Sequence, residues 1–120
     1  MSWLNEFLLQ YQNSKVPRLH LADGTTLSVQ VGVGIYYRSK RNAEGRVVFT
    51  HVEVPYLSTD APPSWETYQK TFKHSLTGIY AFLPIELVHY FIASHGGIDQ
   101  EKTYGGAKWV LSYQGLPLTH

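Results

Sequence analysis

The sequence predicts an α+β fold: an antiparallel sheet of three to four strands with an N-terminal helix and a second helix, at about residues 84–95, packed on the sheet. Residues 27–37 and 47–54 alternate apolar and polar side chains, which is the period of half-buried strands. Residues 3–11 and 85–92 instead repeat apolar side chains at helical spacing. The 120 residues, 43% of them hydrophobic, suffice for one core, so we expect a single domain over the whole chain.

The first element is an amphipathic helix from Ser2 to Gln12, with Ser2 in the position of an N-cap. Its apolar side is formed by Trp3, Leu4, Phe7, Leu8 and Tyr11. Asn5 and Glu6 fall on the opposite side. We therefore expect these two polar side chains to face solvent.

Two strands follow the helix, and the pattern of their side chains indicates how the turn between them is built. A two-residue turn would set the apolar Leu19 opposite the polar Ser28. A three-residue loop, residues 22–24, instead sets Leu19 opposite Leu27. Gly24 then takes the left-handed position that closes such a loop. The sequence thus favours the three-residue loop.

The second strand is expected to continue to Tyr37 and to pair with a third strand, with Tyr37 opposite Val48. The side chains of the inward rows are then Leu27, Val29, Val31, Val33, Ile35, Val48, Thr50, Val52 and Val54. On the outward face, Tyr36, Gly34 and Gly32 would lie opposite Phe49, His51 and Glu53. In this register the two glycines leave a shallow floor that admits a ligand or another backbone. In the alternative interpretation, they let the strand bend or make room for the N-terminal helix or for the segment around Trp65.

The turn-rich segment of residues 58–78 is long enough to be either a functional loop or a cover for the sheet. Ser64 is placed to cap one or two helical turns that carry Trp65. Residues 79–83 are expected to form a short strand. Residues 84–95 are the clearest helix, with proline at its first turn and glycine at its end. A last strand is expected around residues 109–113.

The composition excludes several classes of function. Lys and Arg number 10 against 9 Asp and Glu, so the formal charge of +1 provides no overall field toward nucleic acid or an anionic membrane. Without cysteine there is neither a disulfide framework nor a thiol-ligated metal. No apolar run has the length of a membrane helix, and the first residues lack the pattern of a secretory signal. We expect a soluble, cytoplasmic protein that needs no cofactor.

Basic side chains gather in the hairpin loop of residues 38–46, next to Tyr36. They are Arg38, Lys40, Arg41 and Arg46. Guanidinium groups bind oxyanions and aromatic rings stack on bases, so this loop fits a nucleic acid or an acidic protein surface. A solvated hairpin tip is the alternative, because Glu44 dilutes the charge.

The histidines give a weaker signal. His51 and Glu53 are two residues apart on one face of a strand, which is the arrangement of an acid–base pair or of part of a metal site. A zinc site would need further ligands that the sequence does not place, so we expect no metal. His95 falls near the C-terminus of its helix, where its ring is expected to meet free carbonyls and the negative end of the dipole.

The block "TYQKTFKHSLTGIYAFLPIELVHYFIASHGGID", together with the earlier "VPRLHLADGTTLSVQVGVGIYY", resembles small uncharacterised proteins carried by bacteriophages, prophages and plasmids. The resemblance covers most of the chain and rests on fold-like motifs: the strand that enters "LPIELV" and the helix that ends in "HGGI". It implies an accessory protein that binds a partner, including inhibitors of host defence systems such as anti-CRISPR proteins.

The leading interpretation is a non-enzymatic binding protein of mobile-element origin that acts on a host protein through a protein–protein surface. The alternative is a nucleic-acid or nucleotide binder that uses loop 38–46, and a third is a small hydrolase or metal site at His51 and Glu53. If the basic loop is not the working surface, the aromatic segment from Trp65 to Phe72 is the next candidate.

Overall fold

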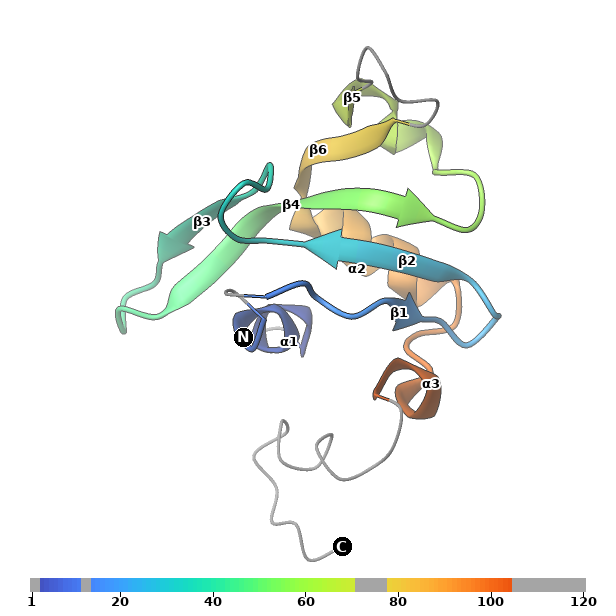
Figure 1. Cartoon of the computed structure of the whole chain (residues 1–120), viewed down its shortest axis with the longest axis horizontal. Coiled ribbons are helices and arrows are strands. Elements are labelled where there is room, and N and C mark those ends of the chain that lie inside the picture. Colours follow the sequence, from blue (N-terminus) through green and yellow to red (C-terminus); the bar gives the residue numbers. More distant parts are fainter. Residues whose placement is uncertain (1–2, 12–13, 71–77, 105–120) are drawn as a thin grey trace, which may run out of the picture.

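The computed structural model describes residues 3–11, 14–70 and 78–104, and it shows an α+β fold with one antiparallel sheet (Figure 1). The helices are α1 Trp3–Leu9, the 3-10 helix η1 Pro63–Tyr68, α2 Ile85–Ser94 and α3 Gln100–Tyr104. The strands are β1 Leu19–His20, β2 Thr26–Gln30, β3 Arg38–Arg41, β4 Val47–Leu57, β5 Gln69–Lys70 and β6 Ile79–Pro84. The fold class is confirmed. The expected number of three to four strands is wrong, because these described residues form six.

The long strand β4 organises the sheet, whose main order is β1-β2-β4-β6-β5. β4 pairs with β3 along its first half, with β2 along its second half, and with β6 around residues 51–54. Each of these three pairings contains a register shift. Such bulges change which side chains face the core, so strict alternation along β4 does not hold.

The expected continuous strand from Thr26 to Tyr37 is broken by its two glycines. Gly32 and Gly34 have φ angles of 116° and 81°, and the N–H of Ile35 donates to the carbonyl of Gly32 at 3.1 Å. This is a turn, and it leaves Val33 fully exposed at its tip, where we expected an inward side chain. The glycines therefore end a strand, because L side chains rarely adopt these φ angles.

The predicted register of the second hairpin is wrong as a result. Val48 pairs with Lys40 and not with Tyr37, since the chain re-enters the sheet as β3 only after the turn. His51 pairs with Arg38, and Glu53 pairs with Gln30. The floor of two glycines opposite His51 and Glu53 does not form.

The first hairpin matches its prediction. Leu19 pairs with Leu27, and the N–H of Leu21 donates to the carbonyl of Thr25 at 2.8 Å, which closes a three-residue loop. Gly24 has a φ of 92°. The hairpin of β3 and β4 repeats this design: the N–H of Asn42 donates to the carbonyl of Arg46 at 2.9 Å, and a glycine with positive φ precedes Arg46.

Helix α1 buries Leu4, Phe7 and Leu8 as expected, but the prediction for Asn5 is wrong. Asn5 is only 2% exposed. Its Nδ2 donates to the carbonyl of Val47 at 3.2 Å, and its Oδ1 accepts from the N–H of Phe49 at 2.7 Å. The amide thus holds α1 against β4, and a polar residue is buried because both of its groups are paired. The proposed N-cap, Ser2, lies outside the described residues.

Helix α2 forms where the sequence predicts it, between Pro84 as N-cap and two glycines of positive φ, Gly96 and Gly97. Figure 1 shows it behind the sheet. Its buried side chains are Ile85, Val88, Phe91 and Ile92, and they join the core with the inward residues of β2, β4 and β6. The helix covers one face of the sheet, as predicted.

The segment before β6 packs against the core through Trp65 and then joins the sheet edge as β5. Trp65 on η1 is 1% exposed, with its ring 5.3 Å from that of Tyr80 and 5.1 Å from that of Phe91. The N-cap of η1 is Pro62 and has no side-chain hydrogen bond, so the expected capping by Ser64 is wrong. The strand expected around residues 109–113 lies outside the described residues. None of the helices in the described ranges is long and apolar enough to cross a membrane.

Candidate functional site

The basic residues of the sequence prediction lie on a hairpin that extends to one side of the sheet (Figure 1). Residues 38–41 form β3, with all four side chains exposed, and not a loop as we expected. The turn itself is fixed by Asn42, whose Oδ1 accepts from the N–H groups of Glu44 at 3.0 Å and of Arg46 at 2.9 Å. A strand holds its side chains in fixed directions, so the cations are presented in a defined order.

The structure separates the four cations of this hairpin into two groups. Arg41 donates from Nη1 to the carbonyl of Gly45 at 2.6 Å, and Arg46 lies 3.4 Å from Oε1 of Glu6. These two guanidinium groups are engaged with the protein itself. Arg38 and Lys40 have no carboxylate partner among the residues that the structure describes. They are the cations of the hairpin that remain available to a ligand.

Arg38 belongs to a group of four side chains that we call the cation–aromatic cluster: Tyr36, Arg38, Lys70 and Phe82. The guanidinium carbon of Arg38 lies 4.8 Å from the ring centroid of Phe82, and Nζ of Lys70 lies 4.6 Å from that of Tyr36. The two rings meet edge to face at 5.6 Å. Each cation is thereby held over the face of a ring, an arrangement that the quadrupole of the ring favours.

Beside this cluster is an open hollow of about 630 Å³. Arg38, His51, Lys70 and Phe82 line it, together with Thr67, Tyr68, Gln69, Ala81 and Pro84. These described lining residues include cations and no carboxylate. Nδ1 of His51 is within 2.8 Å of the hydroxyl of Thr50, which fixes the ring plane. The hollow therefore offers an electropositive surface with an aromatic wall.

The backbone at Phe82 is unusual. Its φ of 51° is the one positive value at a non-glycine residue within the described ranges, and it falls at the register shift between β4 and β6. The N–H of Phe82 donates to the carbonyl of Tyr36 at 3.2 Å. Strained residues and bulges are frequent at functional sites, where they aim a side chain. Here the bulge places the ring of Phe82 between Tyr36 and Arg38.

His51 and Glu53 do not form the acid–base pair that their spacing suggested. Glu53 is 7% exposed and lines a second hollow with Gly32, whereas His51 lines the cationic hollow. The separation follows from the altered register of β4. Across residues 3–11, 14–70 and 78–104, no group of three or more His, Cys, Asp or Glu side chains is placed to hold a metal ion. Trp65, the other expected binding residue, is part of the core.

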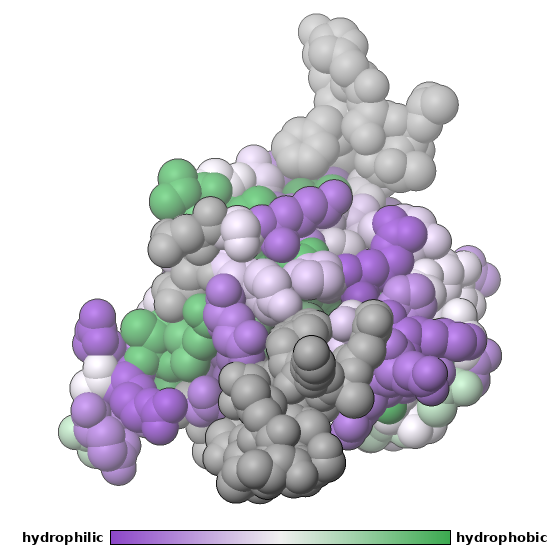
Figure 2. Space-filling view, turned by 60° about the horizontal axis from the view of Figure 1, so that its bottom comes forward, coloured by the Kyte–Doolittle hydropathy of each residue, from purple (hydrophilic) through white to green (hydrophobic). Residues whose placement is uncertain are grey.

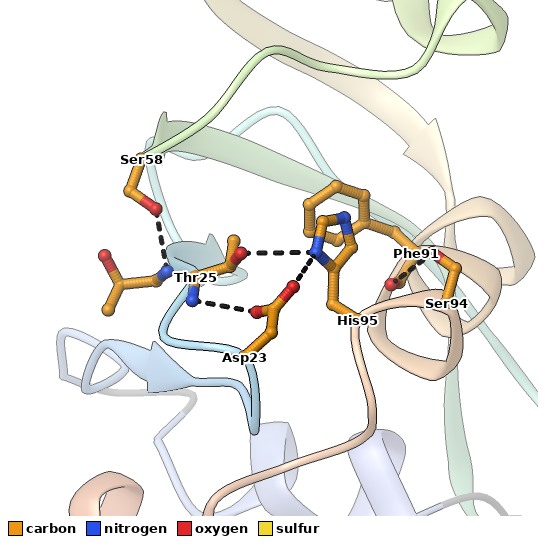
Figure 3. Close-up of polar contacts among 7 residues, drawn as sticks. Asp23, Thr25, Ser58, Phe91, Ser94 and His95 are labelled. Carbon is orange, nitrogen blue, oxygen red and sulfur yellow. Dashed lines mark hydrogen bonds and ion pairs between the residues drawn. The ribbon is translucent and has the colours of Figure 1, made fainter.

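A second polar cluster joins the first hairpin to the end of α2 (Figure 3). Nδ1 of His95 lies 2.5 Å from Oδ2 of Asp23 and 3.2 Å from Oγ1 of Thr25, and its ring packs at a tilt against that of Phe91, with the centroids 4.2 Å apart. The ring thus meets a carboxylate, and not the helix carbonyls that we expected. Both oxygens approach the same ring nitrogen, so the Thr25 hydroxyl is not placed for deprotonation by the other nitrogen, as a catalytic triad requires.

Asp23 supplies the carboxylate of this cluster, and hydrogen bonds fix its position. Its hydrogen bonds with the backbone and hydroxyl of Thr25, and then with His95, lower its pKa from 3.8 to about 2. The neighbouring N–H of Ala22 donates to the carbonyl of Gly97 at 2.9 Å. We assign this cluster a structural role, because it joins two turns far apart in the sequence.

The sequence named Tyr36, Arg38 and His51 as candidate binding residues, but it did not name Lys70 and Phe82, which the structure places beside them. The missing signal is nonlocal: these two residues reach the site only because β5 and β6 pair with each other and β6 pairs with β4. On the face seen in Figure 2, hydrophilic side chains separate small hydrophobic areas. The described part of that face therefore lacks one broad apolar patch. No protein-family model, curated protein or solved structure matches the chain.

Proposed function

We propose that the protein is a non-enzymatic binding protein that recognises an acidic protein through its basic hairpin and the cation–aromatic cluster. The observation that carries this proposal is the placement of the Arg38 and Lys70 side chains. Both cations are held over aromatic rings beside one hollow, and neither has a carboxylate partner among the described residues. Cations ordered in this way gain charge-assisted hydrogen bonds when an oxyanion arrives, at little cost in side-chain entropy.

Charge balance supports a protein over a nucleic acid as the partner. The chain carries a formal charge of +1, and another hollow lined by the hairpin combines Lys40 and Arg46 with Glu44 and Glu86. Nucleic-acid binding generally needs a basic stripe that neutralises many phosphates. A small cationic area beside aromatic rings suits the rim and anchor residues of a protein interface.

Nucleic acid is the second candidate, and a specific observation favours it. Arg38, Lys40 and Arg41 stand within four residues on an exposed strand, with the ring of Tyr36 nearby. This combination of cations and rings is used by proteins that bind single strands. The two candidates share one surface, and they differ in whether nuclease treatment removes the partner.

We further propose a mobile-element origin and a cytoplasmic host protein as the target, with inhibition of a host defence system as the specific form. This part rests on the resemblance of residues 16–37 and 67–99 to accessory proteins of phages, prophages and plasmids. The positive charge of the cation–aromatic cluster then indicates which region of the target the protein would bind. Cations suit an acidic region of a host protein, whereas an acidic inhibitor would suit a basic one.

The test is a pull-down from bacterial lysate with the full chain as bait, with and without nuclease. Two variants accompany it: Arg38→Glu combined with Lys70→Glu, and the control Arg18→Glu. Arg18 also lies over an aromatic ring, 4.0 Å from the centroid of Tyr56, but outside the cluster. We expect a protein that survives nuclease treatment, is absent with the double variant and is kept by the control. Retention only in the absence of nuclease would establish the second candidate, and equal capture by the double variant would refute both.

A further inference from the structure

Glu53 is a nearly buried carboxylate that has no charged partner in the described part of the chain. It lies in β4 opposite Gln30 and is 7% exposed. Its Oε1 accepts a 3.1 Å hydrogen bond from the N–H of Tyr36. No cation lies within ion-pair distance of it among the described residues. Buried carboxylates are normally paired, because an isolated one is costly to desolvate.

The neighbours of Glu53 have their polar groups occupied elsewhere. Gln30 accepts from the N–H of Val16 at 2.9 Å, and its Nε2 donates to the carbonyl of Val16 and to the hydroxyl of Ser28. The side-chain amide is therefore satisfied and has no donor left for the carboxylate. Within the described ranges, Oε2 of Glu53 has no hydrogen-bond partner.

The carboxylate lines a hollow of about 510 Å³, whose walls combine apolar and polar side chains. Lys15 is among them, but it forms no ion pair with Glu53. The lining residues are Ser14, Lys15, Gln30, Val31, Gly32, Val33, Ile35, Glu53 and Pro55. Gly32, the exposed Val33 and Ile35, from the turn, form one wall of this hollow. The apolar part of this wall, formed by Val31, Ile35 and Pro55, together with the nearly buried carboxylate, is complementary to a cation at the end of an aliphatic stem.

We propose that this hollow binds an organic cation, an ammonium or guanidinium group on an aliphatic chain, with Glu53 as its counter-ion. The cation replaces the missing charged partner of Glu53, and the stem lies against Val31, Ile35 and Pro55. Two sources share this chemistry: a free diamine, and a Lys or Arg side chain of a bound protein. The inference is independent of the proposed function, which uses the opposite charge in a different hollow.

The experiment is a ¹H–¹⁵N NMR titration of the full chain with three probes. These are cadaverine, Nα-acetyl-lysine methylamide and the neutral Nα-acetyl-norleucine methylamide. We expect the two cations to shift the amide signals of Gly32, Val33 and Tyr36, with dissociation constants on the order of 1 mM. Tighter binding of cadaverine indicates a free diamine, and tighter binding of the lysine amide indicates a protein side chain. Shifts that the norleucine amide causes equally, or no shift at about 20 mM of either cation, would overturn the proposal.

Glu53→Gln is the decisive variant, since glutamine keeps an oxygen that accepts from the N–H of Tyr36 while removing the charge. It should fold and bind the cationic probes at least about tenfold more weakly. Glu44→Gln, at the exposed hairpin tip, is the matched control and should bind as the parent does. If Glu53→Gln fails to fold, Val33→Lys supplies a second measurement: a cation at the wall should weaken both cationic probes, and unchanged affinity would overturn the site.

Discussion

Tyr36 and Phe82 are joined twice, by a 3.2 Å hydrogen bond from the N–H of Phe82 to the carbonyl of Tyr36 and by edge-to-face packing of their rings at 5.6 Å. The N–H of Tyr36 also donates to Glu53. One residue of the segment between β2 and β3 is thus fixed both to a bulge of β6 and to a side chain of β4. Tyr36 therefore links Phe82, which lines the cationic hollow, to Glu53, which lines the other proposed binding site.

The first prediction concerns the left-handed backbone of Phe82. Phe82→Gly and Phe82→Ala both remove the ring, so both abolish its packing against Tyr36 and Arg38. They differ in that glycine adopts a φ of 51° without strain and alanine does not. We expect the glycine variant to have the higher free energy of unfolding, by about 1 kcal/mol, in urea denaturation. An alanine variant as stable as the glycine variant would show that the bulge is not left-handed in solution.

The second prediction contrasts two valines on either side of Gly32. Val31 is 3% exposed, so Val31→Asp would bury an unpaired charge and should abolish cooperative unfolding. Val33 is fully exposed, so Val33→Asp should change the free energy of unfolding by less than about 0.5 kcal/mol. Urea denaturation followed by tryptophan fluorescence measures both. If Val33→Asp is as damaging as Val31→Asp, the second strand continues through the glycines.

The third prediction concerns the basic hairpin. Reversing Arg38, Lys40 and Arg41 together to Glu should lower the free energy of unfolding by about 1 kcal/mol or less, because exposed charges and cation–π interactions contribute little. The affinity for the partner should fall much more than the stability does. Surface plasmon resonance with the captured protein partner should show mainly a slower association rate, as expected when attractive charges are removed from an interface rim.

For a nucleic-acid partner the same triple variant has a different signature. Its affinity should depend less steeply on salt, by nearly one unit of slope for each phosphate that the variant no longer neutralises. Arg18→Glu serves as the control in both cases. A triple variant with the parent's rate and affinity would show that the hairpin is only a solvated tip.

The fourth prediction concerns the acid side of the stability profile. The hydrogen bonds to Asp23 lower its folded-state pKa to about 2, below the 3.8 of an unperturbed aspartate. The ionised form is therefore favoured by folding, and this contribution is complete above pH 3.8 and disappears as the pH falls toward 2. We expect the difference in stability between the parent and Asp23→Asn to shrink over that interval. Denaturant midpoints measured at steps of pH test this, and a constant difference would contradict it.

The sequence by itself determined the elements whose signals are local. The three-residue loop at residues 22–24 follows from the alternation of Leu19 and Leu27 and from a glycine at the one position that needs positive φ. Helix α2 follows from its apolar spacing between a proline and two glycines. In both cases the residues that make the decision lie within a few positions of one another, so periodicity and turn chemistry suffice.

The tertiary structure decided everything that depends on which segments meet. The same two glycines are compatible with a bent strand, a floor or a turn, and pairing of β4 with Lys40 in place of Tyr37 selects the turn. Bulges then bury Phe49 and Glu53, which strict alternation places outside. Asn5 is buried because two backbone groups of β4 pair with its amide, and Lys70 and Phe82 reach Tyr36 through the pairing of distant strands. These outcomes depend on interactions between residues far apart in the chain, whose energies no local pattern contains.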